Sequence, residues 1–557
     1  MITINKNVFR FLWCFVFITL LYSCGVSKSI HDIPDITQFP VHNHERVKVN
    51  DSTFYAGNNF LTKNQYGLWE LYVEGNPYQL GLNTGLLTQE LFEKQEDAFL
   101  SKVEQIVPSK FKQKLLQKFL AWYNRKMYLN IPNDYKAEIF GLSKYASDRY
   151  DYVAENYLRV LYLHGAHDIG HALQDLALVG CSSFAVWNNK TEDGDIILGR
   201  NFDFYAGDEF AKNKIIAFVN PNQGHKFMSI TWAGMIGVVS GMNEHGLTVT
   251  INAGKSKIPL VAKTPISILT REILQYATNI EEAIAIAKTK EVFVSESIMV
   301  GSAKDNKAIL IEVSPDNFGV YEIENSSQLI CANHFQSASY KDDENNTKHI
   351  KESHSKYRFD RMQELLEDSE KITPEKAIEI LRNRKGLNNK AIGYGNEKSL
   401  NQLLAHHGIV FKPKDKLVWI SSSPYQLGEF VAYDLNKIFG NPDYSTSLSE
   451  HQLLVEADPF LKTEAYQNYE DYRVLERAIE AAINTKKQLP TDKLKALKLK
   501  NPDYWKANYL IGKYYYQKNY YKAALIEFKE ALSKEVTTVP DEVAIKAYIK
   551  KIKRKLN

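Results

Sequence analysis

Cysteine is scarce in this chain, which has four among its 557 residues. Two of them, Cys14 and Cys24, stand close to the N-terminus, so only Cys181 and Cys331 remain for the rest of the chain. At most one disulfide could form there, although an exported protein usually pairs its cysteines. The sequence also lacks the Cys-x-x-Cys and His-Glu-x-x-His patterns, which excludes the commonest zinc motifs.

Signals for nucleotides and nucleic acids are lacking as well. No glycine-rich loop that would cradle a phosphate and no dinucleotide fingerprint occurs in the sequence. The formal net charge is only +3, and no stripe of basic and aromatic residues suggests a nucleic-acid surface. We therefore expect no cofactor, no resident metal and no nucleic-acid partner.

An apolar run near the N-terminus is too short to span a bilayer comfortably. Lys6 and Arg10 precede this run, which extends from Phe11 to Tyr22. It ends in Leu21-Tyr22-Ser23-Cys24, which is close to a bacterial lipobox. We predict that residues 1–23 are a lipoprotein signal peptide and that Cys24 carries lipid, with an uncleaved anchor as the alternative. The chain would then be tethered to the bacterial cell envelope, in the periplasm or at the surface.

The periodicity of apolar residues divides the remaining chain into four parts. Residues 24–65 show no sustained periodicity and are predicted to be a tether, whereas residues 66–180 are predicted to be mostly helical. Strands dominate residues 181–440, where two separated groups of helices interrupt them, and residues 441–557 return to helices. This pattern predicts an α+β fold in which two sheets lie between two helical layers, a four-layer αββα sandwich.

The strands predicted in the central part are short apolar runs bounded by polar turns. They are Ser183–Trp187, Ile196–Leu198, Phe227–Trp232, Leu247–Asn252, Ile298–Gly301, Ala308–Val313, Leu329–Ala332, Ile409–Lys412, Leu417–Ile420 and Phe430–Tyr433. Helices are predicted near Ile266–Ala287, Arg358–Leu366 and Pro374–Leu381.

The C-terminal part carries the pattern of one tetratricopeptide-like repeat near residues 505–535. Small residues that let two helices approach alternate with aromatic residues that fill the gap, at positions Gly512, Tyr515, Ala524, Phe528 and Ala531. Because several stacked repeats are normally needed, a helical hairpin that packs on the preceding domain is the equal alternative. Such helices are a candidate site for a protein partner.

The stretch Gly180-Cys181-Ser182-Ser183 is followed across a polar turn by Gly199-Arg200-Asn201-Phe202-Asp203. The turn is rich in Asn, Asp and Gly, so the two flanking runs are predicted to form a hairpin. Because the strand ends of a hairpin meet, Cys181, Arg200 and Asp203 should converge at one edge of a sheet. A guanidinium near a thiol favours the thiolate, which is the nucleophilic form.

Further segments follow in a fixed order: Asn243-Glu244-His245-Gly246-Leu247 running to Asn252, then Asn333-His334, then Ser355-Lys356-Tyr357-Arg358, with Gly75-Asn76-Pro77-Tyr78-Gln79-Leu80-Gly81 upstream. With the hairpin, these segments resemble the N-terminal-nucleophile (Ntn) hydrolases of the cysteine type. Within them the chain is similar to the branch of penicillin acyltransferases (isopenicillin N acyltransferase, peptidase C45-like), choloylglycine or bile-salt hydrolases, and acid-ceramidase-like amidases. The resemblance spans roughly residues 71–435 and also implies the αββα fold.

The resemblance implies that Cys181 is the nucleophile and that its own α-amine is the proton shuttle. An α-amine has a reference pKa of about 7.7–8.0, so it can take up a proton near neutral pH. Cys181 is internal, so the bond between Gly180 and Cys181 must first be cut, and residues 66–180 would be a helical prosegment. Asp203 would hold the ammonium, and Arg200 would polarise the thiol and contact the scissile carbonyl.

The remaining roles follow from the same resemblance. Asn333, with Asn252 as second donor, would supply an oxyanion hole, and Arg358 would hold the geometry of the cluster. Each residue also has an ordinary structural interpretation. Asn333 could simply end a strand, Arg358 could be an exposed helix residue, and Cys331 is most simply packed core.

A competing site is built on three histidines at helical spacing. His164, His167 and His171, with Asp168, could share a helix face just ahead of the predicted cut and bind zinc. A polar face of the last prosegment helix is the simpler interpretation. The pair His406-His407 opens a predicted strand and is interpreted as structural.

The leading hypothesis is a self-processed, membrane-tethered cysteine Ntn enzyme that cleaves a non-peptide amide with an apolar acyl group. It would act through an acyl-thioester, as an amidohydrolase or an acyltransferase, on an N-acyl amine, N-acyl amino acid or bile-salt-like substrate. A catalytically silent binding lipoprotein that uses its C-terminal helices for partners is the second hypothesis. A zinc enzyme built on the three histidines is the third.

Overall fold

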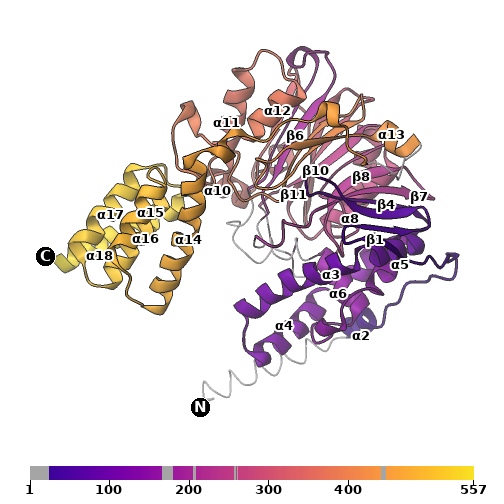
Figure 1. Cartoon of the computed structure of the whole chain (residues 1–557), viewed down its shortest axis with the longest axis horizontal. Coiled ribbons are helices and arrows are strands. Elements are labelled where there is room, and N and C mark those ends of the chain that lie inside the picture. Colours follow the sequence, from indigo (N-terminus) through magenta and orange to yellow (C-terminus); the bar gives the residue numbers. More distant parts are fainter. Residues whose placement is uncertain are drawn as a thin grey trace, which may run out of the picture.

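The structure is a computed structural model that describes residues 24–165, 168, 180–204, 208–255, 257, 259, 261–440 and 447–556. Two β-sheets are stacked face to face at its centre (Figure 1). The larger sheet has eleven strands in the order β1-β2-β3-β4-β7-β8-β9-β10-β11-β12-β13, and all its neighbours are antiparallel except β4 and β7. The bounds of its strands are β1 Val47–Asn50, β2 Thr53–Ala56, β3 Asn59–Lys63, β4 Trp69–Gly75, β7 Ile215–Pro221, β8 Phe227–Thr231, β9 Ser240–Asn243, β10 Leu247–Ala253, β11 Glu296–Ser302, β12 Lys307–Ser314 and β13 Asn317–Tyr321.

The smaller sheet has six strands in the order β14-β5-β6-β15-β16-β17. Their bounds are β14 Gln328–Cys331, β5 Ser182–Val186, β6 Ile197–Phe202, β15 His407–Lys412, β16 Leu417–Ser421 and β17 Phe430–Asp434. Between the sheets lies an apolar core in which residues such as Phe218 and Met228 of the larger sheet pack against Leu198 and Ile409 of the smaller one. Successive side chains of a strand point to opposite faces, so each sheet fills this core with one face and packs on helices with the other. Burial on both faces explains why the strands appear in the sequence as continuous apolar runs.

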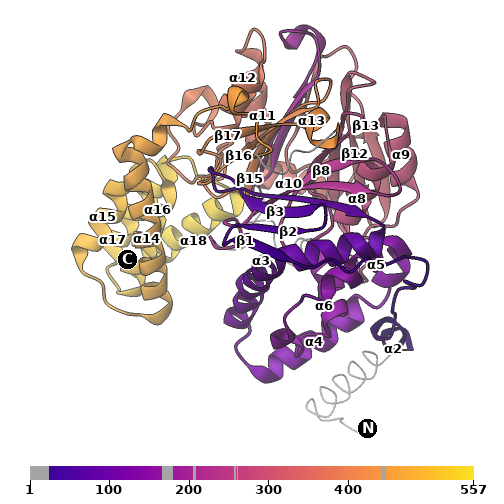
Figure 2. The ribbon, with the colours of Figure 1, turned by 45° about the vertical axis from the view of Figure 1, so that its right-hand side comes forward.

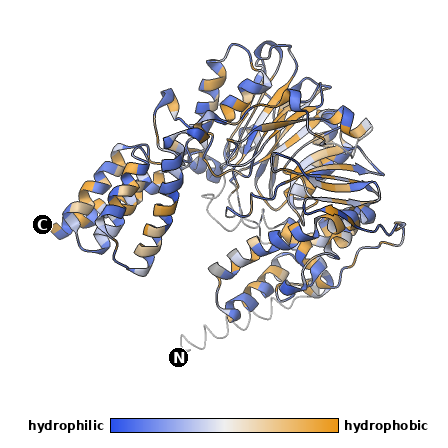
Figure 3. Cartoon of the chain, in the orientation of Figure 1, coloured by the Kyte–Doolittle hydropathy of each residue, from blue (hydrophilic) through white to orange (hydrophobic). Residues whose placement is uncertain are grey.

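Helices cover both outer faces of this pair of sheets. The outer face of the larger sheet packs on α3 Pro77–Ile106, α5 Asn133–Ser143, α6 Asn156–His164, α8 Ile266–Tyr276 and α9 Ile280–Lys288, with α4 Lys110–Tyr123 and α2 Cys24–Ile30 beyond them. The outer face of the smaller sheet packs on α11 Ser355–Glu367 and α12 Pro374–Leu381, with α10 Glu344–Glu352 next to α11. The short helix α13 Leu435–Gly440 instead packs on the core between the two sheets. The predicted α+β class and the four layers are therefore confirmed. Figure 3 shows apolar residues gathered along the strands, while the helices carry both polar and apolar sides.

The C-terminal helices have a hydrophobic core of their own. They are α14 Glu464–Thr485, α15 Thr491–Lys500, α16 Trp505–Gln517, α17 Tyr521–Ser533 and α18 Val539–Leu556. A Cβ on Gly512 would lie 2.9 Å from the Phe528 ring, so the small residue does let α16 and α17 approach closely. In both views these helices stand apart from the N-terminal helices (Figures 1 and 2). Their assignment as a tetratricopeptide-like unit stays a prediction.

The prediction of a tether over residues 24–65 is wrong. This region contains α2 and the strands β1, β2 and β3, which extend one edge of the larger sheet. Phe54, Phe60 and Leu61 are buried there. The strands have only four or five residues each, which is too short for alternation to stand out, and the neighbouring strand supplies the partner that makes them stable.

Two further differences concern the helical predictions. Residues Trp69–Gly75 lie at the start of the segment predicted to be mostly helical, but they form β4. The apolar side chains of β4 point alternately to the outer helices and to the core between the two sheets. The helix predicted over Ile266–Ala287 is broken in two, because Asn279 caps a new helix by accepting a hydrogen bond from the backbone of Glu282.

Residues 1–23 lie outside the described residues. Among the described residues, no helix is long and apolar enough to cross a membrane.

Candidate active site

The predicted hairpin is present, and it brings the three candidate residues to one end of the smaller sheet. β5 and β6 pair antiparallel with Ser183 opposite Arg200. Beyond the last pair, the backbone N–H of Gly180 donates to the carbonyl of Asp203 at 3.2 Å. The intervening Cys181 is therefore fixed on both sides by the ladder. Its thiol is buried and free of any disulfide, as is that of Cys331.

Arg200 is fully buried next to the thiol. One guanidinium nitrogen, Nη2, lies 3.8 Å from Cys181 Sγ and also donates to the carbonyl of Ile251. The other, Nη1, donates to the carbonyl of Val239 at 2.7 Å and to the hydroxyl of Ser240. These backbone carbonyls hold the charged group in place without neutralising it, so its positive charge stays available to the sulfur.

Burial nevertheless decides the charge state of the thiol. Loss of solvent raises the pKa of Cys181 to about 11, against the opposing pull of the Arg200 guanidinium. The Arg200 guanidinium lowers the pKa of Cys181, in the predicted direction, but burial raises this pKa by more. Transferring a thiolate from water into the protein interior costs more free energy than its attraction to one guanidinium 3.8 Å away recovers. In the uncut chain a base must remove the proton as the sulfur reacts.

Asp203 is a carboxyl group of the cluster, and it is also fully buried. Its Oδ1 accepts a long hydrogen bond of 3.5 Å from Gln426 Nε2, and within the part of the chain that the structure describes its Oδ2 has no hydrogen-bond partner. Burial raises its pKa to about 7, although Arg358, Gln426 and Arg200 all act to lower it. A buried carboxylate oxygen without a donor is costly, and the cationic α-amine of a cut Cys181 would supply one.

We predict a specific pH signature for Asp203 in a Cys181→Ala chain, which cannot cut itself. The folded-state pKa of about 7 lies above the ordinary 3.8, so the stability that this group contributes is present below the unfolded pKa and is lost as pH rises through about 7. Asp203→Asn should remove that loss. The unfolding free energy of this variant, relative to that of its parent, should therefore increase by up to roughly 4 kcal/mol between pH 4 and pH 8. Denaturant unfolding of both chains across this range measures the difference, and parallel curves would contradict the assignment.

Arg358 lies at the centre of the cluster, on α11. Its side chain is fully buried, so the alternative interpretation of Arg358 as an exposed helix residue is wrong. Nη1 donates to the carbonyl of Cys181 at 2.5 Å and to Ser182 Oγ at 2.8 Å, and Nη2 donates to Asn333 Oδ1 at 2.6 Å. Its fork of donors therefore joins the backbone of the nucleophile to Asn333, which fixes their mutual geometry.

The two asparagines differ in what their amide groups have left to donate. Asn252 Nδ2 donates to the carbonyls of Cys331 and Ala332 at 3.2 and 3.1 Å, so both its amide protons are used. Asn333 Nδ2 donates to the Ala253 carbonyl at 2.9 Å, and among the described residues its second amide proton has no acceptor. Arg358 holds the Asn333 amide in one orientation. Asn333 is thus the better candidate for an oxyanion donor, and Asn252 joins β10 to the end of β14.

Gln402 contacts the predicted cut, although the sequence did not indicate it. Its Nε2 donates to the carbonyl oxygen of Gly180, the bond predicted to be cut, at 2.8 Å. A Cβ on Gly180 would lie 2.2 Å from that same nitrogen. A side chain at position 180 would therefore displace the glutamine amide, so glycine lets this amide approach the Gly180 carbonyl closely. No motif surrounds Gln402, so nothing in the sequence marked it.

The three-histidine site predicted as an alternative lies partly outside the described residues, because His167 and His171 do. His164 is buried, with Nδ1 facing the Val160 carbonyl at 2.8 Å and Nε2 accepting from the backbone N–H of Ile236 at 2.9 Å. Both ring nitrogens are therefore engaged within the protein. Asp168 accepts from the N–H of Ile266 at 2.8 Å, and burial raises its pKa to about 8.

Two further pairs of histidines lie close together. His406 and His407 are buried and lie behind the site, where His407 Nε2 contacts the Ser240 hydroxyl at 2.9 Å and so touches the partner of Arg200. At the surface, ligand atoms of His225, Glu244 and His245 lie within 4.8 Å of one another, which is close enough for one cation. The two rings already share a hydrogen bond of 3.1 Å, which accounts for their approach.

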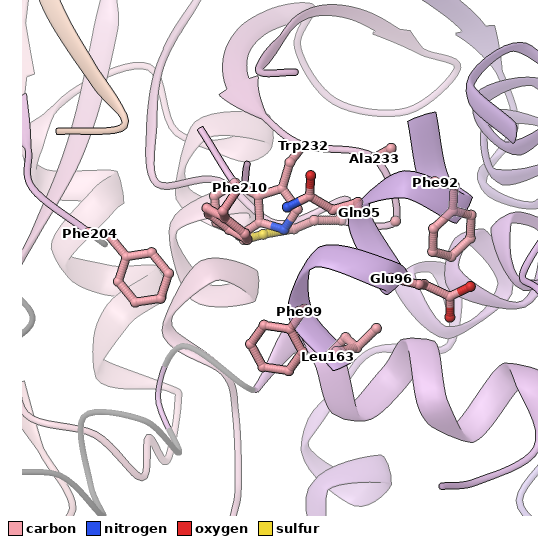
Figure 4. A pocket seen from close by; sticks show the side chains of 11 residues that line it. Phe92, Gln95, Glu96, Phe99, Leu163, Phe204, Phe210, Trp232 and Ala233 are labelled. Atoms are coloured by element: carbon pink, nitrogen blue, oxygen red, sulfur yellow. The ribbon is translucent and has the colours of Figure 1, made fainter. Parts of the chain in front are cut away.

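An apolar pocket lies between the N-terminal helices α3 and α6 and the segments that follow β6 and β8 (Figure 4). Phe92 and Phe99 come from α3, and Phe210 and Trp232 come from the other side. Phe204, which directly follows Asp203, also lines it. The pocket can therefore receive an apolar group next to the segment that directly follows Asp203.

Comparison with known proteins agrees with this geometry. Residues 187–423 match the family model described as acyl-coenzyme A:6-aminopenicillanic acid acyl-transferase. The match includes Arg200, Asp203, Asn252, Asn333 and Arg358, and it begins after Cys181. With the two stacked sheets and their outer helices, this match over part of the chain supports the predicted resemblance to the Ntn hydrolases.

Relatives of this chain are distant. An uncharacterized protein of Archaeoglobus fulgidus is 26% identical over 277 residues, covering 46% of this chain and 45% of the relative. Protein dcd1B of Dictyostelium discoideum is 23% identical over 309 residues, covering 51% and 58%. The chain thus spans about half the length of these curated relatives.

Solved structures with a likeness include a Caenorhabditis elegans N-acylethanolamine-hydrolyzing acid amidase ortholog, with 20% identity, a TM-score of 0.31, and coverage of 42% of this chain and 93% of the other. A mutant of the conjugated bile acid hydrolase from Clostridium perfringens has 14% identity, a TM-score of 0.32, and coverage of 46% and 92%. TM-scores this low support no argument about fold or activity.

Proposed function

We propose that this chain is a self-processed cysteine Ntn amidohydrolase or acyltransferase that cleaves a non-peptide amide through an acyl-thioester on Cys181. The observation that carries the proposal is the cluster itself. A buried free thiol lies 3.8 Å from the Arg200 guanidinium, and Asp203 beside it has a carboxylate oxygen without a donor. The glycine that precedes the thiol has its carbonyl oxygen already hydrogen-bonded.

In the self-cleavage step, Cys181 Sγ attacks the carbonyl carbon of Gly180 as Asp203 accepts the thiol proton. The C–N bond then breaks, the nitrogen of Cys181 takes up a proton, and the Gly180 carbonyl is left as a thioester. Water hydrolyses this thioester, which releases the Gly180 carboxylate and the thiol. The new α-amine then lies next to Asp203, whose unpartnered Oδ2 accepts its hydrogen bond.

In the mature site the α-amine replaces Asp203 as the base, because its reference pKa of about 7.7–8.0 suits proton transfer near neutral pH. It takes the thiol proton as sulfur attacks the substrate amide, and it returns a proton to the leaving amine. The free N–H of Asn333 stabilises the oxyanion while Arg358 holds the amide. Water or a second nucleophile then releases the acyl group, which separates a hydrolase from an acyltransferase.

The proposed substrate has an apolar acyl group joined to a polar amine, such as an N-acyl amine, an N-acyl amino acid or a bile-salt-like conjugate. The aromatic lining of the pocket in Figure 4 supports an apolar acyl group. The proposal keeps the sequence-based lipid anchor on Cys24 and the cell-envelope location. It also keeps a protein partner at the C-terminal helices, with support from sequence only.

Two measurements on the purified full chain test the proposal. Intact mass and N-terminal sequencing should find a fragment that begins at Cys181. A panel of long-chain N-acyl amines and N-acyl amino acids, with and without an added acceptor amine, should then give free acid or a new amide. An active chain whose Gly180–Cys181 bond is intact would contradict the mechanism.

Asn333→Ala should lower kcat about 10²–10³-fold with little change in KM, because one oxyanion donor is worth about 2.7–4 kcal/mol in the transition state. Steady-state kinetics on the cut enzyme measures this effect. Asn346→Ala is the matched control, since this buried asparagine makes its own backbone contacts with Phe335 away from the thiol. An unchanged kcat in Asn333→Ala would exclude the oxyanion role.

A further inference from the structure

Two loops that bear glutamines reach the predicted cut. The first, the 402 loop, is residues 401–403, and its Gln402 donates to the Gly180 carbonyl at 2.8 Å. The second, the 426 loop, is residues 422–426, and its Gln426 donates to Asp203 Oδ1 at 3.5 Å. Both glutamines are buried. The carbonyl and the carboxylate that the proposed self-cleavage uses are thus each met by a neutral amide donor.

Both loops have an unfavourable backbone. Leu403, Tyr425 and Gln426 have φ angles of +54°, +50° and +68°, in the left-handed region that side chains other than glycine rarely adopt. Such a conformation persists only where the surroundings hold it. The position of each glutamine therefore depends on what holds its loop.

The C-terminal helix α14 holds the 402 loop. Tyr469 of α14 donates its hydroxyl hydrogen bond to the carbonyl of Leu403 at 3.2 Å. The Leu403 side chain is fully buried in the core of the C-terminal helices. The residue next to Gln402 is therefore a member of the C-terminal core.

The same helix holds the 426 loop. The Tyr425 hydroxyl donates to Glu470 Oε1 at 3.0 Å and accepts from Arg473, and both of these residues are on α14. Asn401 Nδ2 donates to the Tyr425 carbonyl at 3.3 Å, which joins the two loops. Three residues within two turns of one helix thus contact both loops, alongside Arg382, which donates to the Gln426 carbonyl at 3.1 Å.

We propose that α14 and the C-terminal core are part of the self-cleavage apparatus, because they hold Gln402 on the carbonyl that the thiol attacks. As the C–S bond forms, the Gly180 oxygen becomes an oxyanion, and the Gln402 N–H already points at it. A neutral amide suits this task because it adds no charge that would bind water. The inference rests on the proposed self-cleavage and gives the C-terminal helices a role in it.

The test follows the fragment that begins at Cys181 as the full chain is made in a cell-free translation system. Gln402→Leu should cut about 100-fold more slowly or worse, by loss of one oxyanion donor. Tyr469→Phe should cut several-fold more slowly. In the double variant the second change should add nothing, since both act through one hydrogen bond.

Matched controls come from the same helical region. Gln517 donates to the Ile483 carbonyl at 2.8 Å, and the buried Tyr514 contacts the backbone of Leu489, both away from the two loops. Gln517→Leu and Tyr514→Phe should cut at the unaltered rate. Gln402→Glu adds a signature that misfolding cannot give: its rate relative to the unaltered chain should rise as pH falls, because only the protonated carboxyl can donate.

The outcomes separate the two proposals. If the unaltered chain is never cut, the proposed function fails. If it is cut, and Gln402→Leu and Tyr469→Phe are cut as fast as their controls, the role of α14 is overturned. The role of α14 is also overturned if Gln402→Leu is cut slowly but the cleavage rate of Gln402→Glu, relative to the unaltered chain, does not rise as pH falls.

Discussion

A Cys181→Ala chain is expected to stay one polypeptide and to lose amide cleavage by at least 10³-fold. Alanine removes the sulfur that attacks both the Gly180 carbonyl and the substrate, and residual activity after loss of a nucleophile comes only from binding and the oxyanion donor. Intact mass would show one species that contains both halves, and product release from an N-acyl amine would fall to the background rate.

Cys331→Ala is the matched control, because Cys331 is the other buried free cysteine and belongs to the core between the sheets. That variant should be cut and should remain active, with only the modest loss of stability expected from a small cavity. A Cys181→Ala chain that is still cut at Gly180 would place the nucleophile elsewhere.

Arg358→Met is expected to block self-cleavage and to lower the unfolding free energy by about 3–5 kcal/mol, because it removes one partner from a buried charged network. The change leaves the Cys181 carbonyl, Ser182 Oγ and Asn333 Oδ1 without their donor. It also withdraws the positive charge that lowers the pKa of Asp203. Denaturant unfolding and the appearance of the Cys181 fragment measure the two effects separately.

Arg361→Met separates loss of stability from loss of function. Arg361 is as deeply buried on the same helix, but it contacts Asn383, Glu364 and Asn389 instead of the thiol cluster. It should lose comparable stability and still be cut. If both variants are cut equally, Arg358 is a structural residue only.

The hairpin could be predicted from sequence because its signals are local. Two apolar runs flank a turn rich in Asn, Asp and Gly, and pairing then places Cys181 beside Asp203 without further information. The central strands were equally clear, since each has an apolar run of its own. The short strands β1 to β3 were missed because their stability comes from a neighbour far along the chain, which no local pattern records.

The candidate site could be predicted only in part. Arg200 and Arg358 were found through their order along the chain, but the sign of the effect on the Cys181 pKa depends on burial, which a sequence does not show. Gln402 could not be found, because it meets Gly180 across 222 positions of sequence. A loop glutamine in contact with a single carbonyl oxygen leaves no periodic or spaced pattern behind.

The parallel pairing of β4 with β7 has a consequence for the fate of the two halves. Seven residues of β4, from before Cys181, align with seven of β7, from after it. A cut between the two strands severs the covalent chain but leaves this ladder intact, in the interior of an eleven-stranded sheet. The two fragments would therefore stay associated through this ladder. Each fragment supplies strands to a sheet that the other fragment needs for its present fold.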